Sequence, residues 1–294
     1  MGRENKYDRS EGSGFRLMRI THRISLNSSP TIRKELATLG VVIGSSGFVA
    51  FDIDESQPQW SKIADWMKRR GISSFVSTSF SETEVRAAAW IALKPTWHHG
   101  YPQPNADVFG YREVTYDLTE YCDLCGIGKK QKAPFQMKAE PRWGRSGILQ
   151  LNWIVDEYFA LPRVWSTVFK PYGIECRPVT NKRGIPLKTV VQLVSTEEVD
   201  IVTDELSRSK CVKCGRIKYL PVSRGPFPSL INMPSVHIVK TRQNFGSGAS
   251  AYREVLVSKD IARLLLANKV RGVSLLPVQA CIASPTVGSA TLTA

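Results

Sequence analysis

The residues best suited to chemistry form two copies of one short pattern. Residues 122–126 read CDLCG and residues 211–215 read CVKCG. Two cysteines three positions apart in a tight turn can direct both thiolates at one metal ion, and the following glycine lets the chain leave the turn with positive φ. Four thiolates complete the closed tetrahedral shell of a structural zinc site, which has no open position for a catalytic water. The pattern therefore predicts one structural zinc ion, with these ligands: Cys122, Cys125, Cys211 and Cys214.

Two other uses of paired cysteines fit the sequence less well. A redox pair usually follows a strand and opens a helix, whereas glycine and a basic, polar stretch follow both pairs here. A disulfide framework needs a secretory context, and residues 1–14 lack the apolar core of a signal peptide. The remaining cysteines, Cys176 and Cys281, are solitary, and we interpret them as a buried thiol and a tail thiol.

The composition indicates a soluble, globular protein. The chain has 294 residues, of which 42% are hydrophobic, so it can bury the core of one large domain or two ordinary ones. No apolar run approaches the ~20 residues of a membrane span, so no membrane association is expected. Cysteines of the zinc-binding kind, together with the polar N-terminal segment, predict a cytoplasmic protein.

The charge is strongly basic. The formal net charge is +14 and the pI is near 9.6, which suggests a polyanion or an acidic protein as the partner. Part of this charge compensates a tetrathiolate zinc centre, whose formal charge is about −2. No acidic residue occurs from Ser207 to Gly225, a stretch that holds these cations near the second pair: Arg208, Lys210, Lys213, Arg216 and Lys218. Lysines 129, 130 and 132 follow the first pair, and the total predicts a basic surface patch.

The first part of the chain predicts an α/β-type domain over residues 15–105. Residues 15–20, 47–53 and 72–78 have the composition of strands. Pro58 starts a predicted helix with one apolar face, which Gly71 ends. Residues 81–84 read SETE, a capping box that opens a second predicted helix reaching Leu93. No glycine-rich phosphate loop is present.

The second part predicts a β-rich domain over residues 106–278. Its base is a zinc ribbon split by an insertion at residues 127–207, since 85 residues lie between Cys125 and Cys211. Strands are expected at 111–118, 188–194, 236–239, 252–257 and 273–278, with a helix that begins after Ser258. The whole is an α+β protein, and the tails at residues 1–14 and 279–294 are predicted to be disordered.

Two further groups of residues could bear function. Residues 97–104 read WHHGYPQP, which is either an ordered aromatic loop packed on the core or a binding loop. Asp156 and Glu157 are adjacent carboxylates, and neighbours on a helix do not face each other as an acid and a base would. No nucleophile–base spacing is recognisable, which favours a protein that is not an enzyme, although the fold could still assemble a site around His98, His99 and Asp156.

The order of features after Cys211 is distinctive. A C-x-x-C-G is followed by a proline-rich stretch, a loop with Phe245, a strand ending in VLVS, a helix, and a glycine before the last strand. With the earlier C-x-x-C-G, this order resembles the double-CxxCG-motif proteins of bacteria. Some of these act as immunity proteins in contact-dependent toxin systems. The resemblance implies that the four cysteines are zinc ligands; the chain differs in its long N-terminal region and its long insertion.

Two functions fit these observations. The first is a bacterial, non-catalytic, zinc-stabilised protein that binds a protein partner, such as an acidic toxin or effector, in an immunity or defence role. The alternative is a nucleic-acid-binding zinc ribbon, with basic residues on phosphates and Trp97 or Trp143 stacked on bases. In both cases the predicted contact residues lie near the second cysteine pair and in the aromatic loop: Lys213, Arg216, Lys218, Trp97, His99 and Tyr101.

Overall fold

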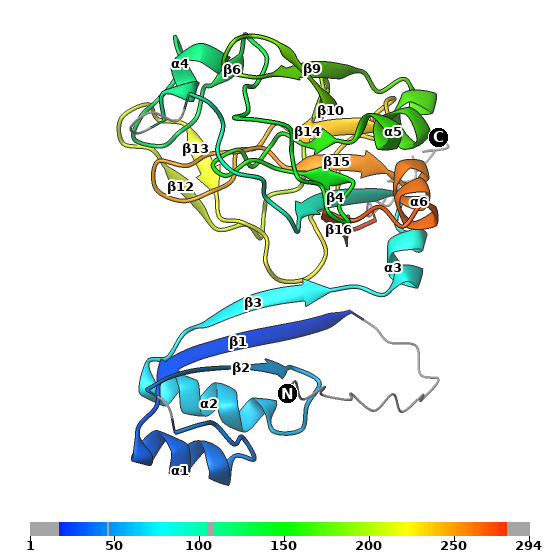
Figure 1. Cartoon of the computed structure of the whole chain (residues 1–294). Coiled ribbons are helices and arrows are strands. Elements are labelled where there is room, and N and C mark those ends of the chain that lie inside the picture. The colour runs from blue at the N-terminus through cyan, green and yellow to red at the C-terminus, as the bar shows by residue number, and fades with distance from the viewer. Residues whose placement is uncertain (1–17, 46, 105–108, 281–294) are drawn as a thin grey trace, which may run out of the picture. The chain divides into compact units, whose positions relative to one another are not determined.

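The computed structural model describes residues 18–45, 47–104 and 109–280, and it confirms a mixed α+β fold (Figure 1). The chain divides into two compact units, Met1–Ser81 and Glu82–Ala294. The predicted tail at 1–14, nearly all of the predicted tail at 279–294, and Cys281 lie outside the described residues.

The first unit is a three-stranded antiparallel sheet with two helices on one face (Figure 1). The sheet has the order β2-β1-β3, and its elements are β1 (Arg19–Asn27), α1 (Pro30–Thr38), β2 (Phe48–Asp54), α2 (Trp60–Arg70) and β3 (Ser74–Ser79). The helix predicted to start at Pro58 is α2, which begins two residues later at Trp60, and Gly71 ends it with a φ of +63°. Helix α1 was not predicted; Ser29 caps it by accepting a hydrogen bond from the Ile32 N–H at 3.2 Å.

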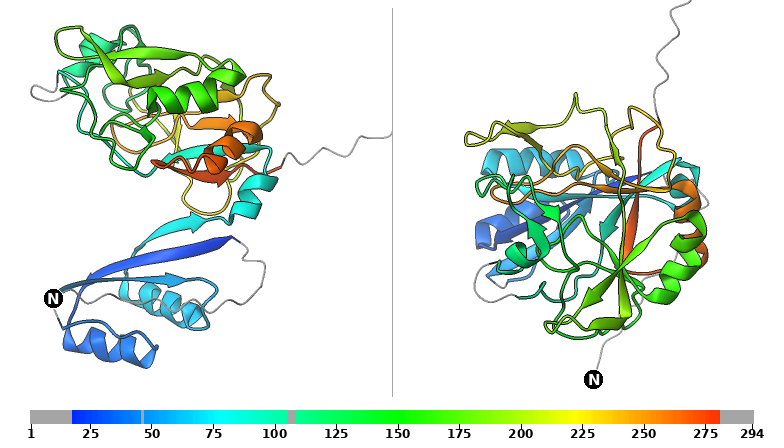
Figure 2. Two further views of the ribbon diagram at one scale, coloured as in Figure 1. Left: turned by 45° about the vertical axis from the view of Figure 1, so that its right-hand side comes forward. Right: turned by 90° about the horizontal axis from the view of Figure 1, so that it is seen from above.

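The second unit contains two larger sheets (Figures 1 and 2). One has the order β11-β14-β15-β4-β16 and consists of β4 (Trp90–Pro95), β11 (Glu198–Val199), β14 (Ile238–Thr241), β15 (Val255–Ser258) and β16 (Val273–Pro277). The other has the order β7-β8-β10-β9 and consists of β7 (Ile148–Leu149), β8 (Phe159–Ala160), β9 (Cys176–Thr180) and β10 (Pro186–Leu193). The β11–β14 pair is parallel and the other pairs are antiparallel.

The predicted helix from the SETE box to Leu93 is wrong beyond its first turns. Helix α3 covers only Glu82–Ala87, and the chain then enters β4, which lies between β15 and β16. Its first four residues, WIAL, are all buried, and a strand covered on both faces has a continuous apolar run that resembles a helix face. Because β4 belongs to this sheet, the second unit begins at Glu82, before the predicted boundary at residue 105.

The predicted strand at 111–118 is also wrong. Helix α4 (Tyr111–Thr115) occupies most of it, and β5 (Tyr116–Asp117) follows. Tyr111 and Thr115 are both buried, and a separation of four residues places them on one face of a helical turn. A further helical segment was not predicted; it consists of α5 (Pro162–Val164), the π-helix η1 (Trp165–Phe169) and the 3-10 helix η2 (Lys170–Tyr172).

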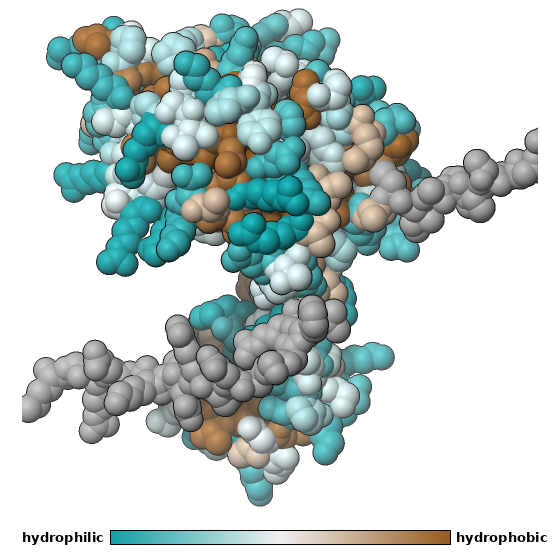
Figure 3. Space-filling model, turned by 90° about the vertical axis from the view of Figure 1, so that its right-hand side faces the viewer, coloured by the Kyte–Doolittle hydropathy of each residue, from teal (hydrophilic) through white to brown (hydrophobic). Residues whose placement is uncertain are grey.

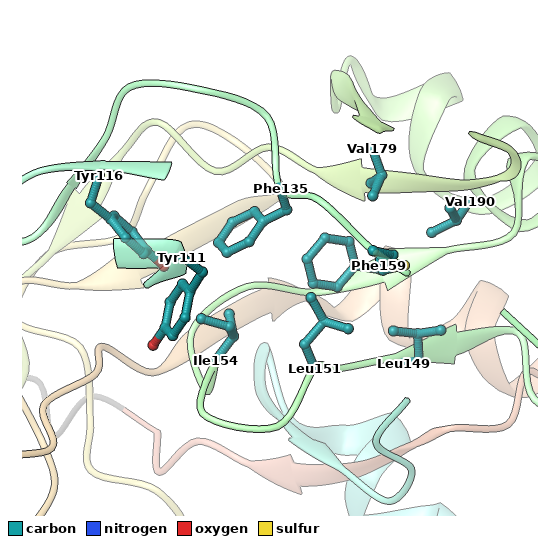
Figure 4. Packing of buried hydrophobic residues seen from close by; sticks show 10 residues of the cluster. Tyr111, Tyr116, Phe135, Leu149, Leu151, Ile154, Phe159, Val179 and Val190 are labelled. Atoms are coloured by element: carbon teal, nitrogen blue, oxygen red, sulfur yellow. The ribbon is translucent and has the colours of Figure 1, made fainter. Parts of the chain in front are cut away.

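An aromatic core holds the insertion together (Figure 4). The Phe135 ring meets the Phe159 ring edge to face at 5.4 Å and the Tyr116 ring at 5.8 Å between centroids. Leu149, Leu151 and Val190 belong to the same buried cluster. Because Tyr116 belongs to β5, this core anchors the hairpin that carries the first cysteine pair.

The end of the second unit agrees with the sequence. Helix α6 (Lys259–Ala267) follows Ser258, and β16 follows Gly272. On the face shown in Figure 3, the surface of the second unit is mostly hydrophilic, and hydrophobic side chains are exposed in patches between the hydrophilic ones. Among the helices of the described residues, none combines the length and the apolar character needed to cross a membrane.

Candidate metal centre

Each cysteine pair lies at the end of a two-stranded hairpin. Strand β5 pairs with β6 (Lys130–Gln131) around the first pair, and β12 (Arg208–Lys210) pairs with β13 (Ile217–Tyr219) around the second. The two turns have the same hydrogen bonds. The N–H groups of Cys122 and Cys211 each donate to the carbonyl five residues later at 2.9 Å, and those of Gly126 and Gly215 donate back to the first cysteine of each pair at 2.7 and 2.9 Å. The identical pattern explains why both turns need a C-x-x-C-G.

The structure confirms that the four predicted cysteines come together. Their Sγ atoms all lie within 4.8 Å of one another. The Sγ atoms of Cys122 and Cys211 are 3.8 Å apart, and those of Cys125 and Cys214 are 3.6 Å apart. A disulfide has an S–S length of about 2.05 Å, whereas four sulfurs at about 2.3 Å from a tetrahedral metal lie about 3.8 Å apart. The four thiols are therefore free and spaced to hold one metal ion.

The thiols have different surroundings, which shift their pKa values in different directions. The Arg216 guanidinium donates through Nε to the Cys214 Sγ at 3.3 Å, and this hydrogen bond lowers the pKa of the Cys214 thiol to about 6. The backbone N–H of Cys125 lowers the pKa of Cys122. Burial raises the pKa of Cys125 to about 12. A bound cation favours the thiolate at every position, so metal binding should release protons, most of all at Cys125.

Arg216 is part of the centre and not of a free surface. Besides its bond to Cys214, its Nη2 donates to the Glu120 carbonyl at 2.8 Å, which ties the second turn to the first hairpin. A Cβ atom on Gly128 would lie 2.0 Å from that carbonyl oxygen and 2.6 Å from Arg216 Nη1. Glycine at 128 therefore leaves the space through which the guanidinium reaches Glu120.

Lys218, predicted to contact a partner, is buried with 5% of its surface exposed. Its ammonium group donates to three backbone carbonyls, those of Cys125 at 2.9 Å, Ser250 at 3.0 Å and Gly248 at 2.5 Å. An ammonium group has three N–H donors, so all of them are used inside the protein. The prediction is corrected: Lys218 joins the two turns to the loop before β15, because its stem points inward from β13.

Lys213 is exposed and forms an ion pair with Asp123 at 2.7 Å. The pair connects the second residue of the CDLCG turn to the third residue of the CVKCG turn. A solvent-exposed pair of this kind contributes little to stability, so Lys213 stays available to a partner at small cost.

The aromatic loop is held in place by backbone pairing. His99 N–H donates to the Gln150 carbonyl at 2.8 Å, and Gln150 N–H donates to the Trp97 carbonyl at 3.1 Å. The Trp97 ring is half-buried against the aromatic core, 5.9 Å from the rings of both His99 and Trp143. Of the three predicted contact residues here, only Tyr101 is exposed, and it packs on Trp153 at 4.4 Å.

The other candidates do not form a second metal site. Within the described part of the chain, neither His98 nor His99 belongs to a cluster with metal-ligand spacing. His99 is half-buried, and burial lowers its pKa. Glu157 is buried and forms an ion pair with Lys240, while Asp156 accepts one N–H from Arg253 at 3.4 Å. Residues 156–158 are not helical and lead into β8.

The two motif glycines should differ in their tolerance of alanine. Both have positive φ, +82° at Gly126 and +72° at Gly215, which disfavours any side chain by about 1–2 kcal/mol. A Cβ on Gly126 would also lie 2.4 Å from the Ala249 carbonyl oxygen, whereas a Cβ on Gly215 meets only the Lys210 Cε at 3.8 Å. We expect Gly126→Ala to lower the free energy of unfolding clearly more than Gly215→Ala, as measured by urea denaturation of the metal-loaded protein. Equal losses would contradict the packing described.

A scan against protein-family models finds no match to this chain, and a search of curated proteins finds none either.

Proposed function

We propose that the protein is a non-catalytic binding protein that one zinc ion stabilises and that recognises a protein partner. What supports zinc is the donor set: four thiolates in tetrahedral spacing favour Zn²⁺ or an iron–sulfur centre. Four protein ligands leave no open position for water or substrate, so the ion would hold structure. Purified protein should be colourless and contain one equivalent of zinc.

The proposed biological role is immunity or defence in a bacterial cytoplasm. It rests on the resemblance of the paired C-x-x-C-G motifs to the double-CxxCG proteins, and the net charge of +14 favours an acidic toxin or effector as the partner. Binding without turnover would be enough for such a role.

The observation that carries the proposal is a surface on the second hairpin, defined by Arg208, Lys210, Val212 and Ile217. Val212 is 93% exposed and Ile217 is 41% exposed. Arg208 and Lys210 are exposed on β12, and neither forms an ion pair within the described residues. Exposed apolar side chains beside free cations, on a hairpin that a metal would hold rigid, combine the anchors and the steering charge of a protein interface.

The experiment starts with capture of the partner on tagged protein, with and without nuclease. We expect the associated protein to remain after nuclease treatment and to be identified by mass spectrometry. Loss of all associated material on nuclease treatment would favour the alternative, nucleic-acid binding on the same basic surface.

Once the partner is identified, reversing the positive charges on the second hairpin should weaken the complex. We expect Arg208→Glu with Lys210→Glu to raise the Kd at least tenfold, mostly through slower association, because the change turns attraction of an acidic partner into repulsion. The matched control is Lys182→Glu with Arg183→Glu in the same unit, since both residues are exposed and neither forms an ion pair within the described residues. If the two double variants bind equally well in surface plasmon resonance, the interface lies elsewhere.

A further inference from the structure

A polar cleft of about 580 Å³ lies beside the metal centre, within the second unit. One wall is the chain that leaves the first cysteine turn, residues 126–131, and Arg216 reaches it from the second hairpin. The cleft is also lined by residues 192–196, which include the end of β10, and by Lys240, Arg242 and Arg253. Its volume is in the range of small-molecule sites, which are commonly about 300–1,000 Å³.

Buried polar side chains line the cleft and are fixed by one another. Gln192 is 1% exposed and donates to the Glu157 carboxylate at 2.9 Å. Glu157 also accepts from the buried Lys240 ammonium, and Gln192 exchanges hydrogen bonds with Gln131 at 2.8 and 2.9 Å. Because the members of this charged network are hydrogen-bonded to one another, the network gives the cleft a rigid polar lining.

Lys129 differs from these residues. It lines the cleft, and its Nζ lies 5.4 Å from the centroid of the Tyr116 ring. Its ammonium makes neither a hydrogen bond nor an ion pair with any described residue. The carboxylate of Asp156 lines the same cleft but does not reach ion-pair distance. Burial lowers the pKa of Lys129, which reflects a charge removed from water without a direct counterion.

The net charge of the side chains that line the cleft indicates the sign of the charge that a ligand would carry. Seven cationic side chains face four carboxylates, a difference of +3. The cations are Lys129, Lys130, Arg177, Arg216, Lys240, Arg242 and Arg253, and the carboxylates are Glu120, Asp156, Glu157 and Glu198. An anion entering the cleft would therefore meet net positive charge and, at Lys129, an ammonium whose N–H donors are free.

We propose that this cleft is a binding site for an oxyanion, the phosphate or carboxylate group of a small ligand, and that Lys129 is its anchor. Three N–H donors of a half-buried ammonium form strong, charge-assisted hydrogen bonds to such a group. The Asp156 carboxylate repels negative charge in the cleft. It therefore lowers the affinity for an oxyanion and orients the ligand. The site is independent of the proposed protein partner.

The test measures binding of inorganic phosphate and of succinate to the metal-loaded protein by titration calorimetry, one probe for each source of oxyanion. We expect at least one probe to bind, Lys129→Met to weaken it at least tenfold, and Lys129→Arg to retain most of the affinity. Asp156→Asn should strengthen binding several-fold, because it removes a like charge. Lys138→Met, at an exposed lysine of the same unit, is the matched control and should bind as wild type does.

Folding and metal content of each variant are checked by thermal melting and by zinc analysis. If neither probe binds at millimolar concentration, or if Lys129→Met and Lys138→Met bind equally, the proposal is overturned. A loss of affinity for the anionic probe on Asp156→Asn would also overturn it, since Asp156 would then support the binding of the anion instead of opposing it. These outcomes leave the protein-binding surface on the second hairpin untouched.

Discussion

Replacing Cys211 with serine should abolish stable metal binding and unfold the region around both hairpins. The four Sγ atoms share one site, so three thiolates would remain for a shell that needs four. In small zinc domains, metal binding supplies about 10–16 kcal/mol that is also folding free energy. The ion also links the two ends of the 85-residue loop between Cys125 and Cys211. Without this link, folding has to bring the ends together at an entropic cost of about 4 kcal/mol. Thermal melting and elemental analysis measure the two consequences.

The control for this experiment is Cys176→Ser. Cys176 lies in β9, half-buried, and it is not one of the four clustered thiols. This variant should keep one equivalent of metal and lose little stability. A Cys211→Ser protein that melts like wild type and retains its metal would show that the four cysteines do not form a structural centre.

The metal centre could be predicted from sequence because its geometry is local. Each turn is specified by five consecutive residues, and both turns close with the same pair of backbone hydrogen bonds. What the sequence could not show is how the halves are joined. The three carbonyls that Lys218 binds belong to Cys125, Gly248 and Ser250, which lie 93, 30 and 32 residues from it along the chain, and no spacing rule connects them to it.

Two of the predicted contact residues, Arg216 and Lys218, have internal partners for a related reason. Arg216 and Lys218 belong to a run of cations, and composition alone places such residues on a surface. In the fold, the Arg216 guanidinium donates to a cysteine sulfur and the Lys218 ammonium donates to buried carbonyls. Both contacts form because a thiolate cluster and the carbonyls of a tight loop are stabilised by positive charge nearby. Periodicity could not have separated them, because β12 is exposed throughout and the neighbours Lys218 and Tyr219 are both buried in β13.

Secondary structure was predictable where one face of an element meets water. Helix α2 has an apolar face, a basic last turn and a C-terminal glycine, and each of these is visible in sequence. Strand β4 is covered on both sides, so its pattern lacks the alternation that identifies a strand. Its pairing with β15 and β16 spans more than 150 residues of chain, a tertiary constraint that no window of sequence contains.

Replacing Lys240 with methionine should destabilise the second unit by about 3–5 kcal/mol, the usual effect of leaving one member of a buried ion pair alone. Lys240 is 5% exposed and Glu157 is 9% exposed, so little water can solvate the remaining carboxylate. The hydrogen bond from Gln192 to Glu157 would persist, but a neutral amide does not balance the charge. Urea denaturation of the metal-loaded protein measures the loss.

The double variant Lys240→Met with Glu157→Gln separates charge from packing. It removes both charges while keeping side chains of similar size, so we expect it to recover at least half of the loss seen in Lys240→Met alone. Glu157→Gln alone should also destabilise, because it leaves the ammonium unpaired. If the effects of the two single changes simply add in the double variant, the two groups do not act as a pair, since contacting charges give a coupling energy of about 0.5–3 kcal/mol. Strong coupling would mean that the polar lining of the cleft is held by its own charges.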